Sequence, residues 1–203
     1  MADKRIQAVV GLDLSLTSSG LAILRGEEDN WCYPITRPDK PSPTGYMVMA
    51  CAVVENAMVG LHGLRALWII EGYAYRAPNG MAASGELGGL VKYLLARKDE
   101  LFVVVSPGQL KKFATGRGDA QKDQMRLGVF KAWGVEAKTT DEIDAYAAAR
   151  LGATALGWFE PTNQAQRECV FEVRKQLRGL GLEVPSELAE PKARKGRVKS
   201  DGD

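Results

Sequence analysis

Residues 8–24, AVVGLDLSLTSSGLAIL, decide the fold that this sequence predicts. Two runs of apolar and β-branched residues flank the small polar cluster of residues 17–20, which is typical of a hairpin turn. One carboxylate, Asp13, interrupts the first run. An unpaired charge buried in a strand costs several kcal/mol, so Asp13 needs a metal ion, an Arg or backbone amides as its partner. For this residue taken alone, a turn or capping Asp is the simpler explanation.

The composition is that of an ordinary globular protein. Of 203 residues, 45% are hydrophobic and 26% are charged, and this length suits one domain, alone or with an appendage. The net charge is only +2, and it is uneven, because residues 191–203 hold five Lys or Arg and two Asp. Three cysteines without CxxC spacing suit a reducing cytoplasm and argue against a zinc site. The polar first residues and the short apolar runs predict neither a signal peptide nor a membrane partner.

The rest of the chain alternates between strand and helix patterns, which predicts an α/β sheet that begins with an antiparallel meander. Further strands are expected over residues 31–36, 66–75 and 101–105. Helices are expected over residues 45–64, 81–97, 106–113, 119–133, 141–156 and 163–180, with Asp119 and Thr140 as caps of the fourth and fifth. Residues 186–203 are polar and basic, and we expect them to be disordered.

Four carboxylates stand out against this map. Asp13 lies in the first strand, Glu71 ends the fourth, and Asp141 and Asp144 share one face of a late helix. Acids in a first helical turn often serve only the helix dipole. If all four converge, however, they repel one another unless cations lie between them, and such oxygen ligands select Mg²⁺ or Mn²⁺. Two such ions can activate a water and stabilise the leaving oxygen in phosphodiester cleavage.

The stretch GLDLSLTSSGLAI resembles the first strand and hairpin of the RuvC family of Holliday-junction resolvases, within the ribonuclease H-like superfamily. That family binds its metals through an Asp on strand one, a Glu ending strand four and two carboxylates three residues apart on a late helix. Asp13, Glu71, Asp141 and Asp144 follow in this order. The segment QLKKFATGRGDAQKDQM is similar to a family segment with a Lys at each end, here Lys111 and Lys122.

The resemblance covers residues 5–156 and implies a ribonuclease H-like mixed five-stranded sheet flanked by helices. On this basis we expect a nuclease domain over residues 1–158, and a C-terminal helix with a basic tail over residues 159–203. The resemblance also implies a homodimer formed through the helix at residues 81–97. It implies a cytoplasmic, Mg²⁺-dependent endonuclease with two ions per active site, for which Mn²⁺ substitutes, that cuts four-way junctions in pairs.

Site roles follow from the same resemblance. Asp13, Glu71, Asp141 and Asp144 would hold the metals, Lys122 would lie near the scissile phosphate, and Lys111, Lys112 and Arg117 would hold the strand. Solvated helix ends explain Lys112 and Arg117 equally well. The family's aromatic residue three positions beyond the Glu is replaced by Ala74. Its neighbours Tyr73 and Tyr75 are candidates to substitute for it, although covering the core is the simpler role for them. This departure and the C-terminal extension are typical of a bacteriophage or prophage member.

Three other functions remain open. A nuclease with a broader choice of branched DNA would carry the same acids. An actin-like kinase or ATPase also begins with a G-x-D strand, but it needs a second glycine-rich hairpin and usually about twice the length. A non-catalytic junction-binding protein would not need four carboxylates, which repel DNA in the absence of metal.

Overall fold

The computed structural model describes residues 5–16, 18–26, 29–36, 42–72 and 81–185. Five strands form one sheet in the order β3-β2-β1-β4-β5. They are β1 (Ala8–Asp13), β2 (Ser18–Arg25), β3 (Asp29–Thr36), β4 (Ala66–Glu71) and β5 (Leu101–Val105). The first three pair antiparallel, and β4 pairs parallel with both β1 and β5. The predicted mixed sheet with a meander at its start is confirmed, with Pro34 on an edge strand.

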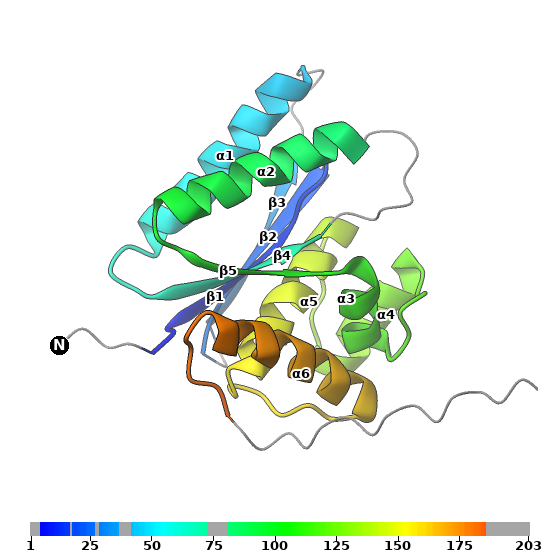
Figure 1. The fold of residues 1–203 in the computed structure, drawn as a ribbon. Coiled ribbons are helices and arrows are strands. Elements are labelled where there is room, and N and C mark those ends of the chain that lie inside the picture. The colour runs from blue at the N-terminus through cyan, green and yellow to red at the C-terminus, as the bar shows by residue number, and fades with distance from the viewer. Residues whose placement is uncertain (1–4, 17, 27–28, 37–41, 73–80, 186–203) are drawn as a thin grey trace, which may run out of the picture.

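Helices cover both faces of the sheet (Figure 1). We call one the α1/α2 face, because α1 (Pro43–Gly60) and α2 (Met81–Arg97) pack on it. We call the other the α5 face, after the helix in contact with β1, β2 and β4. The helices on this side are α3 (Pro107–Thr115), α4 (Lys122–Trp133), α5 (Thr140–Ala155) and α6 (Gln164–Gly179). Within the described ranges, no helix is long and apolar enough to cross a membrane.

Alternation along the strands assigns side chains to these two faces. In β1, Val9 belongs to the core of the α5 face, whereas Val10 and Leu12 belong to that of the α1/α2 face. In β4, Ile69 and Trp68 divide in the same way. Both strands are therefore buried on two sides, which explains why their sequences are continuous apolar runs.

Several predicted boundaries are wrong. Helix α1 ends at Gly60 rather than at residue 64, and β4 ends at Glu71 rather than at residue 75. Residues 18–20 of the expected turn belong to β2, and the connection from β1 lies before them. Asp119 does not cap α4: Gln121 is the cap, and the Asp119 carboxylate accepts hydrogen bonds from Arg117 instead. The cap of α5 is Thr139 rather than Thr140, because Glu142 is placed to complete a reciprocal capping box with Thr139.

The C-terminal extension packs on the main core. Helix α6 contributes Cys169, Val170 and Val173 to the core of the α5 face. Its buried Arg174 donates a hydrogen bond of 2.8 Å to the carbonyl of Ala155, at the end of α5. The division of the chain at residue 158 stays a prediction, and the basic tail lies outside the described residues.

Candidate metal centre

The acidic residues at the ends of β1 and β4 point to the α5 face. Asp13 lies two residues beyond Gly11, and Glu71 two beyond Ile69, so each points to the side on which α5 packs. The parallel register pairs Leu12 with Ile70. Continued by one residue, it brings Asp13 beside Glu71. The neighbouring strands therefore deliver two carboxylates to one end of the sheet.

Helix α5 supplies the third carboxylate. Asp144 lies one turn from the start of this helix, which runs over the sheet from that same end. One carboxylate oxygen from each of Asp13, Glu71 and Asp144 lies within 4.8 Å of the other two. This acidic cluster is the only group of three or more potential metal ligands within the described ranges.

Burial makes the acidic cluster electrostatically unfavourable in its ionised form. Desolvation, followed by the charge of Asp144, raises the pKa of Glu71 to about 8. Desolvation and then Asp141 raise the pKa of Asp144 to about 6. The pKa of Asp13 lies well above its usual value, because of burial first and the neighbouring Glu71 second. Without a cation, protons are the groups that relieve this repulsion.

The donor set fits a divalent cation. Glu71 Oε2 is buried and has no hydrogen-bond partner among the described residues. Oxygen-only carboxylate ligands are those that Mg²⁺ and Mn²⁺ prefer, and a positive ion would offset both the repulsion and the orphaned oxygen. The side chains of Asp13, Glu71 and Asp144 would hold such an ion.

Asp141 lies at the edge of the acidic cluster. It is close enough to raise the pKa of both Asp13 and Asp144. It does not belong to the group whose oxygens lie within 4.8 Å of one another. The structure thus brings three of the four predicted ligands together and places the fourth on the preceding turn of α5. Its role as a ligand stays a prediction.

Two of the predicted basic residues face the acidic cluster. Lys111, on α3, lowers the pKa of Glu71 and Asp144, and Lys122, the first residue of α4, lowers that of Asp13 and Asp144. Each of these effects requires the ammonium group to lie near the acids. The two lysines therefore lie near the acidic cluster, on two different helices.

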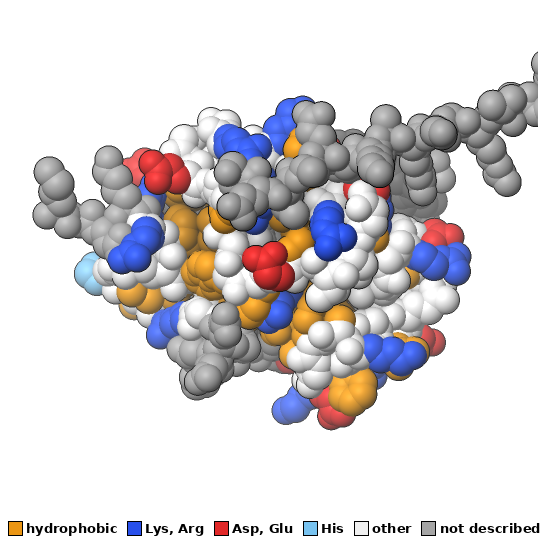
Figure 2. Space-filling model, turned by 90° about the horizontal axis from the view of Figure 1, so that it is seen from below, with side chains coloured by type: hydrophobic (Ala, Val, Ile, Leu, Met, Phe, Trp, Pro, Cys, Tyr) orange, Lys and Arg blue, Asp and Glu red, His pale blue; other side chains and the backbone are white. Residues whose placement is uncertain are grey.

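The other predicted DNA contacts have different surroundings. Lys112 forms an ion pair with Glu168 of α6, and Arg117 forms one of 3.1 Å with Asp119. Each cation already has an acidic partner, so a DNA role stays a prediction for both. Tyr73 and Tyr75 lie outside the described residues. On the side of the molecule seen in Figure 2, Lys and Arg side chains are scattered and form no single basic patch.

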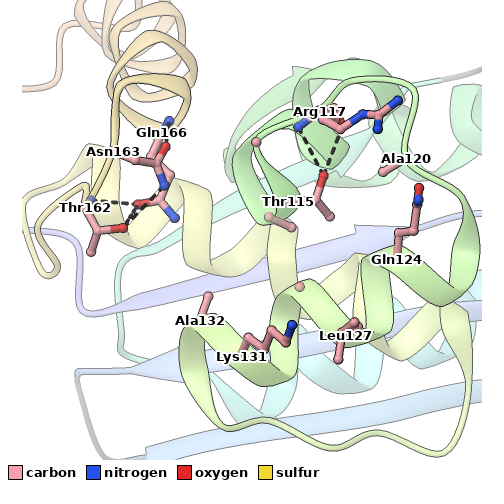
Figure 3. Close-up of a pocket in the computed structure, with 13 residues that line it drawn as sticks. Thr115, Arg117, Ala120, Gln124, Leu127, Lys131, Ala132, Thr162, Asn163 and Gln166 are labelled. Carbon is pink, nitrogen blue, oxygen red and sulfur yellow. Dashed lines mark hydrogen bonds between the residues drawn. The ribbon is translucent and has the colours of Figure 1, made fainter.

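A pocket of about 460 Å³ lies elsewhere, between the end of α3, α4 and the start of α6 (Figure 3). Arg117 and Lys131 are its basic residues, and it has no acidic lining residue. Several of its polar groups already bond one another: the Thr162 backbone N–H and hydroxyl both donate to Gln166 Oε1, and Asn163 Oδ1 accepts from the Gln166 backbone N–H. The pocket shares no residue with the acidic cluster.

Sequence reasoning missed a polar network beside Asp13. The Ser19 hydroxyl accepts a 3.1 Å hydrogen bond from the Ser15 amide and lies 2.7 Å from the Tyr46 hydroxyl. Ser19 is fully buried. This network ties the connection after Asp13 to β2 and α1, so it supports the strand end that carries the first acid. The serine-rich sequence was visible, but the partner on α1 was not.

Comparisons by sequence and by structure both find RuvC among the proteins similar to this chain. No family model matches the chain. The crossover junction endodeoxyribonuclease RuvC of Nocardia farcinica is 25% identical over 147 residues, which cover 70% of this chain and 78% of that protein. The structure of Thermus thermophilus RuvC has a TM-score of 0.57 at 19% identity, and the match covers 70% of this chain and 90% of that one. The T. thermophilus RuvC complex with a Holliday junction substrate gives the same values. In sequence and in fold, this chain is similar to RuvC.

Proposed function

We propose that this protein is a metal-dependent endonuclease that cuts branched DNA, with four-way junctions as its main substrate. The observation that carries the proposal is the acidic cluster, with the orphaned oxygen of Glu71, in a fold shared with RuvC. The similarity to a RuvC crossover junction endodeoxyribonuclease supports the choice of substrate. The bacteriophage or prophage origin and the cytoplasmic location inferred from the sequence remain predictions.

In this function the acidic and the basic residues of the site have different roles. Asp13, Glu71 and Asp144 would hold the cations, and Asp141 would be a further ligand. The chemistry that two Mg²⁺ or Mn²⁺ ions would supply when bound is activation of a water and stabilisation of the leaving oxygen. Lys122 neutralises charge that builds on the scissile phosphate. Lys111, near the acidic cluster on α3, holds the phosphate backbone, and its charge reduces the repulsion between the DNA and the acids.

We also propose that the protein acts as a dimer through α2. Gly85 and Gly89 lie one turn apart, and a Cβ added at either position would meet no atom of the described residues within 4 Å. Packing against the protein's own sheet therefore does not explain these two glycines. Leu90 and Tyr93 on the same helix are 44% and 61% exposed. A second copy would cover this surface, and a two-fold axis would match the two symmetric strands of a four-way junction.

The deciding experiment is incubation with end-labelled four-way, three-way and linear DNA, in Mg²⁺, in Mn²⁺ and in EDTA. We expect paired cuts in the four-way junction with either metal and none in EDTA. Equal cutting of all branched substrates would support the broader nuclease. Binding of junctions without cleavage in any metal would contradict the proposal and favour a junction-binding protein. Asp13→Asn is the control against a contaminating nuclease.

A further inference from the structure

Helix α5 lies directly against the backbone of the first hairpin. A Cβ added at Gly20 would lie 1.9 Å from the carbonyl oxygen of Asp141, and one added at Gly11 would lie 1.9 Å from that of Ala145. Contacts below 3.0 Å do not occur for real Cβ atoms. Because backbone atoms of a helix cannot rotate away, the helix itself would have to move outward, by about 1 Å or more.

These two contacts bracket the part of α5 that carries the acids. Gly20 pairs with Asp13 across the two strands, and its open side faces the carbonyl of Asp141. Gly11 lies two residues before Asp13 and faces Ala145, the residue after Asp144. The hairpin that carries Asp13 is therefore also the surface on which the part of α5 with Asp141 and Asp144 packs.

The far end of α5 is built differently. A Cβ added at Gly152 would come within 2.5 Å of Ile69 Cγ1 and 2.9 Å of Val9 Cγ1, which are side-chain atoms. Both side chains are β-branched and fully buried, so an alanine at Gly152 would also strain the packing. The strain there falls on side chains, at a position eight residues beyond Asp144. The backbone contacts that cannot adapt are the two beside the acids.

We propose that Gly20 and Gly11 are positioning residues that set the reach of Asp141 and Asp144 toward Asp13 and Glu71. This inference rests on the metal-dependent function proposed above. Covering the sheet needs only an apolar helix, and larger residues would serve that purpose. Mg²⁺ demands ligand distances near 2.0–2.1 Å and near-ideal geometry, so an outward shift of about 1 Å at the first turn separates ligands that must converge.

The test compares Gly20→Ala with Gly152→Ala, its matched control on the same helix. Mn²⁺ binding is measured by titration calorimetry without DNA, and thermal unfolding is measured in EDTA. We expect both variants to unfold at lower temperature than the wild type. Only Gly20→Ala should bind Mn²⁺ more weakly, by about 10- to 100-fold. Equal Mn²⁺ affinity in Gly20→Ala and the wild type, or equal losses in the two variants, would overturn the inference.

A rescue variant separates the effect on the position of the Asp141 carboxylate from the effect on the stability of the fold. The longer side chain in Gly20→Ala/Asp141→Glu should recover part of the lost Mn²⁺ affinity without recovering the unfolding temperature. If Gly20→Ala does not fold, the single variant Asp141→Glu is the test. With Gly20 unchanged, the longer side chain should weaken Mn²⁺ binding. Wild-type Mn²⁺ affinity in Asp141→Glu would contradict the inference. A wild-type protein that binds neither Mn²⁺ nor Mg²⁺ would instead refute the proposed function itself.

Discussion

The two faces of the sheet are covered by helices in different ways, although alternate residues of the same strands form both. On the α1/α2 face, large buried side chains such as Trp68, Leu12 and Tyr46 lie between sheet and helices. On the α5 face, glycines bring the helix backbone against the strands, and α5 itself is rich in buried alanines. The first face is an ordinary apolar core, whose spacing follows from side-chain size.

The difference shows what small residues contribute at a charged site. Burial alone would favour larger side chains on α5, because each buried methylene group stabilises the fold by about 0.8 kcal/mol. The α5 face gives up that area and brings Asp144 within 4.8 Å of the strand acids. The α5 face therefore has a short distance between carboxylates in place of additional buried apolar area. This short distance makes the acids repel one another.

The largest expected effect is that of Asp13→Asn on the α5 face. Removing one carboxylate removes a metal ligand, so cleavage should fall to the level of the EDTA control. Binding of four-way junctions in EDTA should be kept or tightened, because one negative charge near the phosphates is lost. Gel-shift and single-turnover cleavage assays measure the two effects. The matched control is Glu55→Gln on α1, which should change neither, and near wild-type cleavage by Asp13→Asn would remove the metal assignment.

Lys122→Ala should have the next largest effect. A cation beside the scissile phosphate acts mainly as charge builds in the transition state, so the single-turnover rate should fall about 100-fold while junction affinity changes little. Lys131→Ala, at the other end of α4, is the control and should leave the rate unchanged. Weaker binding with an unchanged rate at saturation would make Lys122 a strand-holding residue instead.

Repulsion within the acidic cluster predicts a pH-dependent stability that the α1/α2 face does not share. Burial raises the pKa of Glu71 from 4.5 to about 8 in the folded state. The folded protein therefore holds a proton that the unfolded chain releases, and the associated stability is present below about pH 4.5 and lost as the pH rises toward 8. In EDTA the unfolding temperature should fall by at least about 4 °C between pH 5 and pH 8.

Calorimetry or circular dichroism at several pH values checks this prediction. Mg²⁺ should remove most of the decline at pH 8, since a bound cation stabilises the ionised acids. Glu71→Gln should flatten the profile in EDTA, because the residue that titrates is gone. A wild-type profile in EDTA that rises between pH 5 and pH 8 would mean that the acids are ionised without a cation.

Hydrophobic pattern predicted most of the fold, because strand and helix periods are local properties. The bounds of α2 and β5 agree with the prediction from the sequence, and the edge position of β3 follows from Pro34. Caps were less predictable. Asp119 has the right residue type for a cap, but Arg117 two residues earlier binds its carboxylate, and Gln121 caps the helix instead.

The acidic site was predictable as a set of residues, but its geometry was not. The order of the acids along the chain and the ends of β1 and β4 indicate which carboxylates converge. The separation of Asp141 from the other three, and the seating of α5 on Gly11 and Gly20, depend on contacts between segments more than 100 residues apart in sequence. No local pattern encodes such contacts, since a glycine in a strand equally indicates a bulge or a bend.

The smallest expected effect on the cleavage rate comes from the outer surface of the α1/α2 face. Gly85→Leu/Gly89→Leu places bulk on the exposed side of α2, where a second copy would approach. Gly88 is unsuitable for this test, because it is buried within its own subunit and a leucine there would disturb the core. Light scattering should report monomers, and junctions should show single nicks in place of paired cuts.

The rate of each nick should stay within about threefold of the wild type, because the three carboxylates of an acidic cluster come from a single chain. Gly179→Leu, at the open end of α6, is the control and should leave the dimer intact. A variant of α2 that remains dimeric and still makes paired cuts would place the interface on another surface. Lost cleavage in a folded monomer would mean that the α5 face depends on the partner, and the two faces would then be coupled.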